Sequence, residues 1–231
     1  MADKSEYRGR LIAIDGSRGK DTNAAAAALI KALEAKRVEG ALSRFDASGL
    51  FGELAAGARG DRQISARTLT LVYAADLAFR LRWEIRPVLE AGGVVIAAPY
   101  VETAVAFGVA CGLREDWIRE LLRFAPKPSL RVRAEERKID KGWKPRLDRG
   151  YAEYSAAMLR SSSAKLPTKT VRREMIALLE KPVRRSLGGG GRGRKVYRLS
   201  GKGVDALVKA LTDSLRAAPN RSASKPRSAR K

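Results

Sequence analysis

The pattern of apolar and polar positions predicts strands and helices that follow one another along the chain. Runs of strand length, either apolar or alternating, lie at residues 11–14, 37–45, 94–98, 130–133 and 196–199. Apolar positions with helical spacing lie at residues 22–36, 50–58, 64–89, 103–113, 115–124, 151–160, 171–180 and 204–215. Strands separated by helices are typical of βαβ units, whose strands pair in parallel. We therefore expect an α/β fold with a mainly parallel sheet flanked by helices.

A glycine-rich turn follows the first apolar run and precedes an alanine-rich helix. The turn and the first helical positions read Gly-Ser-Arg-Gly-Lys-Asp-Thr over residues 16–22. A strand, a glycine loop ending in Gly-Lys and a helix can cradle nucleotide phosphates, because loop N–H groups and the helix N-terminus face the anion. The residues predicted to bind these phosphates are Gly16, Ser17, Gly19, Lys20, Asp21 and Thr22.

This turn departs from the full P-loop pattern, G-x-x-x-x-G-K-[ST], in two ways. Ile14 stands where that spacing requires the first glycine, so a loop that begins at Gly16 is two residues shorter. Asp21 replaces the hydroxyl residue that binds Mg²⁺, and its carboxylate is able to bind the metal but also repels phosphates. A plain strand–turn–helix connection with Lys20 in solvent is the alternative interpretation.

Composition excludes several classes of chemistry. The chain of 231 residues has no histidine and one cysteine, Cys111. Catalysis by Ser–His–Asp or Cys–His groups, histidine metal sites and intrachain disulfides are therefore excluded. No apolar run approaches the length of a membrane span, and the start of the chain shows no apolar signal region, so we expect a cytoplasmic protein that does not bind membranes.

Positive charge is concentrated toward the C-terminus. The formal net charge is +22, and residues 161–231 hold 19 of the 47 Lys and Arg but 4 of the 25 Asp and Glu. We expect an α/β domain at residues 1–160, a small basic appendage at 161–215 and a disordered basic tail at 216–231. The basic region from residue 165 to 231 is a candidate for non-specific nucleic-acid binding, and a solubilising tail without a partner is the alternative.

Several segments, in order along residues 10–155, resemble thymidylate kinases and related nucleoside monophosphate kinases. Residues 73–78 are similar to the family's A-A-D-R-A helix, and residues 85–96 to its I-x-P-x-L-x-x-G-x-x-V-I segment. The resemblance implies a three-layer P-loop NTPase fold. Positions that carry the family's chemistry differ, because Leu77 replaces the arginine of A-A-D-R-A and Ala98-Pro99 replaces the D-R of D-R-Y.

The same resemblance implies a kinase that transfers the γ-phosphoryl group of ATP to a dTMP-like nucleoside monophosphate. Lys20 and Arg18 are then the catalytic cations that neutralise the moving phosphoryl group. Asp21 or Thr22 is the expected ligand of Mg²⁺. Family members commonly form homodimers through their helices, so a homodimer is a further expectation.

The acceptor nucleotide is expected to contact Arg44, Asp76 and Tyr100, and the charged stretch 133–149 stands where the family has its arginine-bearing lid. Simpler interpretations remain open for two of these residues. Asp76 has Arg80 one turn further along its helix, which is typical of a surface ion pair. For Arg44 the simpler interpretation is a surface cation.

A function of a different class is also compatible with the sequence. In this second hypothesis the chain is a catalytically inactive P-loop scaffold that binds nucleic acid through its basic C-terminal region. A kinase depends on Lys20 and Mg²⁺, whereas a phosphate-backbone binder depends on the basic region and shows strong salt dependence.

Overall fold

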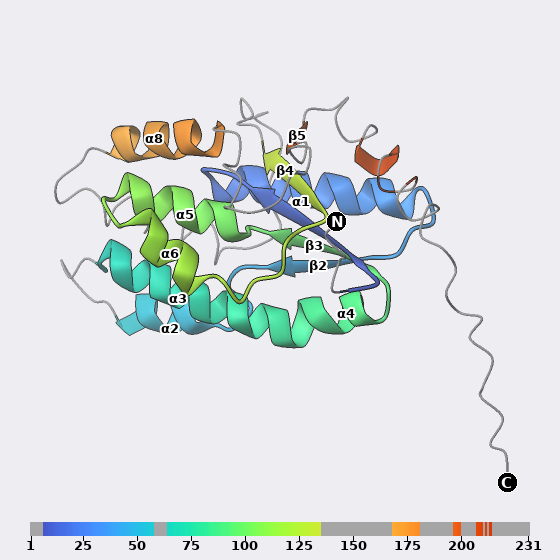
Figure 1. Cartoon of the computed structure of the whole chain (residues 1–231), viewed down its shortest axis with the longest axis horizontal. Helices are drawn as coiled ribbons and strands as arrows, with labels where there is room; N and C mark the ends of the chain where they lie inside the picture. Colours follow the sequence, from blue (N-terminus) through green and yellow to red (C-terminus); the bar gives the residue numbers. More distant parts are fainter. Residues whose placement is uncertain are drawn as a thin grey trace, which may run out of the picture.

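The structure is a computed structural model that describes residues 7–57, 64–134, 168–180, 196–199, 207–209, 211 and 213 (Figure 1). Its strands are β1 (Arg10–Asp15), β2 (Gly40–Arg44), β3 (Val94–Ala98), β4 (Leu130–Ala134) and β5 (Val196–Leu199). Its helices are α1 (Gly19–Glu34), α2 (Leu50–Gly57), α3 (Ala66–Arg80), the π-helical η1 (Leu81–Ile85), α4 (Arg86–Glu90), α5 (Val101–Ala110), α6 (Glu115–Leu121) and α8 (Thr168–Glu180).

Within the described residues, five strands form one sheet in the order β2-β3-β1-β4-β5, and every neighbouring pair is parallel. β1 is central, with Ile12 opposite Ile96 of β3 and Leu130 of β4. Parallel neighbours require crossover connections, and here helices supply those crossovers between β1, β2, β3 and β4. All strands therefore end at the same edge of the sheet.

Helices cover both faces of the sheet, which confirms the predicted three-layer α/β P-loop fold. Successive residues of a strand point to opposite faces, so Leu11 and Ala13 enter one core and Ile12 and Ile14 enter the other. α1 covers the second core, and α3, α5, α6 and α8 cover the first (Figure 1). Among the described helices, none is both long and apolar enough to span a membrane.

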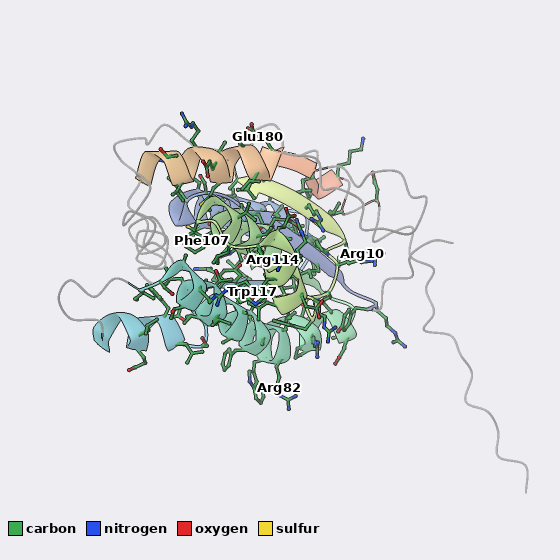
Figure 2. All side chains as sticks on the ribbon, turned by 60° about the vertical axis from the view of Figure 1, so that its left-hand side comes forward. Arg10, Arg82, Phe107, Arg114, Trp117 and Glu180 are labelled. Carbon is green, nitrogen blue, oxygen red and sulfur yellow. The ribbon has the colours of Figure 1, made fainter. Side chains whose placement is uncertain are left out.

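The helical stretch predicted over residues 64–89 is divided into α3, η1 and α4. Ser65 caps its start, since its side chain accepts a hydrogen bond from the N–H of Thr68. Pro87 has no backbone N–H to donate. The N–H of the preceding residue, Arg86, donates to the carbonyl of Leu81, five residues back rather than the four of an α-helix. A wider turn of this kind lets a helix continue past a proline. In Figure 2, Arg82 of η1 lies on the outer surface of this helix.

Two elements beyond the predicted boundary at residue 160 are part of this fold. α8 packs against α5 and buries Val171 and Met175 in the core that α5 shares (Figure 1). β5 pairs with β4 at the edge of the same sheet. The described helical residues Leu207 and Leu211 are buried in the core on the α1 side. The described part of the segment 161–215 thus completes the layers of the α/β domain. The predicted helix 151–160 and the tail 216–231 lie outside the described residues.

Arg80 joins α3 to the ends of two strands. Its side chain is fully buried, and its Nε donates to Ser43 Oγ at 2.9 Å. Its Nη2 donates to the carbonyl of Ser43 at 3.2 Å and to the carbonyl of Pro99 at 3.0 Å. Asp76 Oδ2 lies 3.7 Å from Arg80 Nη1 and is also fully buried. The predicted pair of Asp76 and Arg80 is therefore present, but it lies in the interior rather than on the helix surface.

We expect Arg80→Leu to lower the free energy of unfolding by about 3–5 kcal/mol, because it leaves a buried carboxylate and two buried carbonyls without their cation. Urea denaturation monitored by circular dichroism measures this change. Arg86→Leu, at an exposed position of α4, is the control and should change the free energy of unfolding by less than about 0.5 kcal/mol. A loss below about 1 kcal/mol for Arg80→Leu would contradict the proposed stabilising role of this buried arginine.

Candidate functional site

The turn between β1 and α1 lies at the carboxyl edge of the sheet. β1 ends at Asp15 and α1 begins at Gly19, so Gly16, Ser17 and Arg18 form the connection. Arg18 has an extended backbone, and its carbonyl accepts hydrogen bonds from the N–H groups of Asp21 and Thr22, both at 3.2 Å. The first N–H groups of a helix carry partial positive charge and attract anions. The geometry is compatible with a phosphate site, but with a shorter loop than in a full P-loop.

A buried hydrogen-bond network fixes this turn to α5. Asp15 Oδ1 accepts from the N–H groups of Tyr100 and Thr103, at 3.0 and 2.9 Å, and from Thr103 Oγ1 at 2.8 Å. The Thr103 hydroxyl in turn accepts from the N–H of Gly16 at 3.2 Å. A chain of donors therefore runs from the turn to the Asp15 carboxylate, and it sets the position of Gly16 relative to α5.

Burial changes the protonation of Asp15. Removal from water raises the pKa of its carboxyl group from 3.8 to about 6, and the nearby carboxylate of Glu102 adds to the rise. The three hydrogen bonds from Thr103 and Tyr100 act in the opposite direction, because they stabilise the charged form. The network thus contains a carboxylate that is more readily protonated than an exposed one.

Gly16 lies too close to its neighbours for a larger residue. A Cβ at this position would lie 2.9 Å from Thr22 Cγ2 and 3.1 Å from Ala134 Cβ. The Thr22 methyl group therefore packs under the turn. The Thr22 hydroxyl donates to the carbonyl of Gly19 at 2.9 Å, and the residue has no solvent exposure.

The residues predicted to hold Mg²⁺ do not fit that role in this geometry. The Thr22 hydroxyl is enclosed, and Asp21 Oδ2 pairs with Arg18 Nε at 2.5 Å. The Arg18 guanidinium, predicted to face the γ-phosphate, is thus bound to Asp21. Across the described ranges, no group of three or more Asp, Glu or Cys side chains could hold a metal ion. The side chain of Lys20 lies outside the described residues.

The three residues predicted at an acceptor site have different environments. Asp76 is fully buried, its Oδ1 accepts from the N–H of Ser48 at 2.9 Å, and burial raises the pKa of its carboxyl group. Tyr100 is 1 % exposed, its hydroxyl donates to the carbonyl of Pro126, and burial raises the pKa of its phenol. Arg44 is half-buried at the end of β2. Of the three, Arg44 is the residue whose side chain is accessible.

Two positions at which the resemblance implies charged residues of an acceptor site, 77 and 98, lie in the core of this protein. Leu77 and Ala98 are both fully buried. Of the predicted lid, the structure describes Arg133, whose Nη2 donates to the carbonyl of Ile176 in α8 at 3.0 Å. The lid residues from 135 to 149 lie outside the described ranges.

Sequence reasoning missed Thr103 and Arg80, which hold the turn and the strand ends in place. The sequence did contain a signal that points to Asp15 as a candidate, since an acidic residue at the end of an apolar strand and directly before a glycine is a pattern of functional sites. Thr103 carried none, because one threonine near the start of an apolar helix is compatible with many roles. Arg80 was considered only as a surface partner of Asp76.

Comparison with known proteins confirms the resemblance to thymidylate kinases. The chain is 32% identical over 122 residues to a probable thymidylate kinase 2 of Saccharolobus solfataricus, covering 53% of this chain and 57% of that protein. It is 33% identical over 133 residues to a probable thymidylate kinase of Thermococcus gammatolerans, covering 54% and 64%. The chain thus spans less than two thirds of the length of these curated relatives. No protein-family model matches the chain.

We expect the stability difference between wild type and Asp15→Asn to depend on pH. The pKa of Asp15 is about 6 in the folded state, above the ordinary value of 3.8. Between these two pH values the folded state therefore binds more protons than the unfolded state. As the pH rises through this range, ionisation of Asp15 lowers the free energy of unfolding. Asparagine keeps the acceptor oxygen but does not ionise. The variant should therefore gain up to about 3 kcal/mol relative to wild type between about pH 4 and pH 7. Urea titrations at both pH values measure this difference, and a constant difference would contradict the raised pKa.

Proposed function

We propose that the chain binds the phosphates of ATP at the turn between β1 and α1. The proposal starts from the similarity of the chain to thymidylate kinases, which makes it a relative of the nucleoside monophosphate kinases. The observation that carries the proposal is the position of this turn. It brings the N-terminus of α1 to the carboxyl edge of a parallel sheet, and the Asp15–Thr103–Gly16 network holds it there. Ligands of open α/β sheets bind at this edge.

The binding energy comes from fixed dipoles and cations. The N–H groups of Gly19 and Lys20, the first two of α1, would donate to the anion, whereas those of Asp21 and Thr22 donate to the Arg18 carbonyl. The helix dipole adds an attraction that is strongest within the first turn. Lys20, the second residue of α1, supplies the cation for the outer phosphates. Arg18 supplies a second cation once its pair with Asp21 is exchanged for a phosphate oxygen.

Phosphoryl transfer to a nucleoside monophosphate is the reaction that this site would serve. Such a transfer requires in-line positioning and cations around the moving group rather than covalent participation of the protein. Lys20 and Arg18 would stabilise the donor side. Arg44 at the end of β2, the accessible acceptor candidate, would hold the phosphate of a dTMP-like acceptor on the same edge of the sheet.

We expect Lys20→Ala to weaken ATP binding by at least about tenfold, since one charge-assisted contact to a phosphate contributes on the order of 1.5–3 kcal/mol. Isothermal titration calorimetry with ATP, with and without Mg²⁺, measures the affinity. Lys31→Ala is the matched control, because Lys31 lies exposed in the last turn of the same helix. It removes the same charge at the far end of α1 and should leave the affinity within about twofold.

Absence of ATP binding by the wild type would overturn the proposal and favour the second hypothesis, in which the basic C-terminal region binds nucleic acid. Where ATP binds, a coupled assay of ADP release with dTMP as acceptor tests the transfer. Formation of dTDP in the wild type and its loss in Lys20→Ala would support a kinase. ATP binding without dTDP formation would contradict transfer to this acceptor but leave nucleotide binding in place.

We expect Asp21→Ser to strengthen ATP binding by about tenfold, because it removes a carboxylate next to the phosphates and releases Arg18. Asp21→Asn removes the charge without restoring the P-loop hydroxyl and should give most of this gain. Both are measured by the same titration. Unchanged or weaker binding in the two variants would show that the pair of Arg18 and Asp21 does not oppose the nucleotide.

A further inference from the structure

A pocket lies on the α5 and α6 side of the sheet, next to the proposed nucleotide site. It is bounded by β1 and β4, the start of α5, the end of α6 and the segment 125–128, and it encloses about 450 Å³ with its open mouth included. Figure 1 shows α5, α6 and the strands as neighbours. Asp15 and Tyr100 line the pocket, but residues 16–20 do not. The pocket is therefore adjacent to the proposed ATP site and separate from it.

Charged side chains converge on this pocket from three elements. Glu102 at the start of α5 forms ion pairs with Arg131 of β4, at 2.8 Å between Oε1 and Nη1, and with Arg119 of α6, at 3.4 Å between Oε2 and Nη2. Lys127 also lines the pocket. With Asp15 and Glu102 charged, the lining residues carry three cations and two carboxylates, and Glu115, outside the lining, also pairs with Arg119.

The two arginines retain donors for a further oxyanion. A guanidinium has five N–H donors in a planar fork that matches carboxylate, sulfate and phosphate oxygens. Within the described chain, Arg131 donates through Nη1 to Glu102, and its side chain is 21% exposed. Arg119 donates through Nε to Glu115 at 2.7 Å as well as through Nη2 to Glu102, and its side chain is 42% exposed. Both partly exposed guanidinium groups thus have more N–H donors than these contacts with described residues use.

The rest of the lining is apolar. Val101, Leu122 and Pro126 form part of the wall, together with Pro128. Apolar walls lower the local dielectric, which strengthens the attraction between a guanidinium fork and an anion. Asp15 borders the same space, but its Oδ1 is held by Thr103 and Tyr100.

We propose that this pocket is a second anion site, in which Arg119 and Arg131 clamp a small oxyanion and Glu102 holds the two arginines in its absence. The Glu102 carboxylate lies between both guanidinium groups, as the oxygens of a bound carboxylate or phosphate would. It keeps the side chains convergent, and it competes with the incoming anion for their donors.

Sulfate is the first probe, because its charge does not change near neutral pH. Titration calorimetry of the full chain in the Lys20→Ala background removes one of the two cations assigned to the proposed ATP site and leaves Arg18 paired with Asp21. We expect Arg131→Gln to weaken sulfate binding at least tenfold and Glu102→Gln to strengthen it about tenfold, since the latter releases both arginines and removes a repelling charge. Arg123→Gln is the control, because Arg123 is exposed, pairs with Glu120 and does not line the pocket.

Sulfate affinity that Arg131→Gln and Glu102→Gln leave unchanged, or that Arg123→Gln reduces equally, would overturn the proposal and indicate general attraction to a basic protein. If Arg131→Gln does not fold, Arg119→Gln on the more exposed α6 replaces it, with the same expected loss. Inorganic phosphate and glycerol 3-phosphate, titrated separately, distinguish a free anion from a phosphate ester. Tighter binding of either one supports the site, and binding of none of the three anions refutes it.

Discussion

The parallel pairing of β1 with β3 on one side and β4 on the other is the constraint on which the rest of the structure depends. It buries β1 on both faces and requires a helix layer on each side, because parallel strands cannot be joined by tight turns. It also brings the ends of β1, β2, β3 and β4 to one edge. The turn that starts α1 lies at that edge for topological reasons, before any side chain contributes chemistry.

Polar groups at this edge must be satisfied in the interior, and two networks do so. Asp15 and Thr103 bind the N–H groups where β1 and β3 leave the sheet, and Arg80 binds the carbonyls of Ser43 and Pro99 where β2 and β3 end. Each network joins residues far apart in sequence. The charged groups of Asp15 and Arg80 are buried and incompletely paired, so their removal from water costs free energy. Their hydrogen bonds nevertheless fix the position of the strand ends.

The fold was predictable from the sequence to a larger extent than the site. Apolar runs mark buried strands and helical spacing marks helices, and the structure confirms strands at 94–98 and 130–134 close to the expected bounds. The placement of β5 and α8 within the domain was not predicted, because basic composition does not reveal the pairing of β5 with β4 or the apolar face that α8 buries. Thr103 and Arg80 act through contacts that only tertiary structure creates.

This chain resembles thymidylate kinases in its fold but differs from them at positions 77 and 98, and this difference has a physical basis. Leu77 and Ala98 stand where the family has charged side chains, and both are fully buried in well-packed cores. Apolar residues at these positions stabilise the fold without needing partners, whereas buried charges must be paired. Similarity in the packing therefore does not carry the family's acceptor chemistry with it. What remains at the carboxyl edge is the N-terminus of α1, with Arg18 and Lys20 at its start, and Arg44 at the end of β2. The proposed anion binding at this edge rests on that arrangement and does not depend on charged side chains at positions 77 and 98.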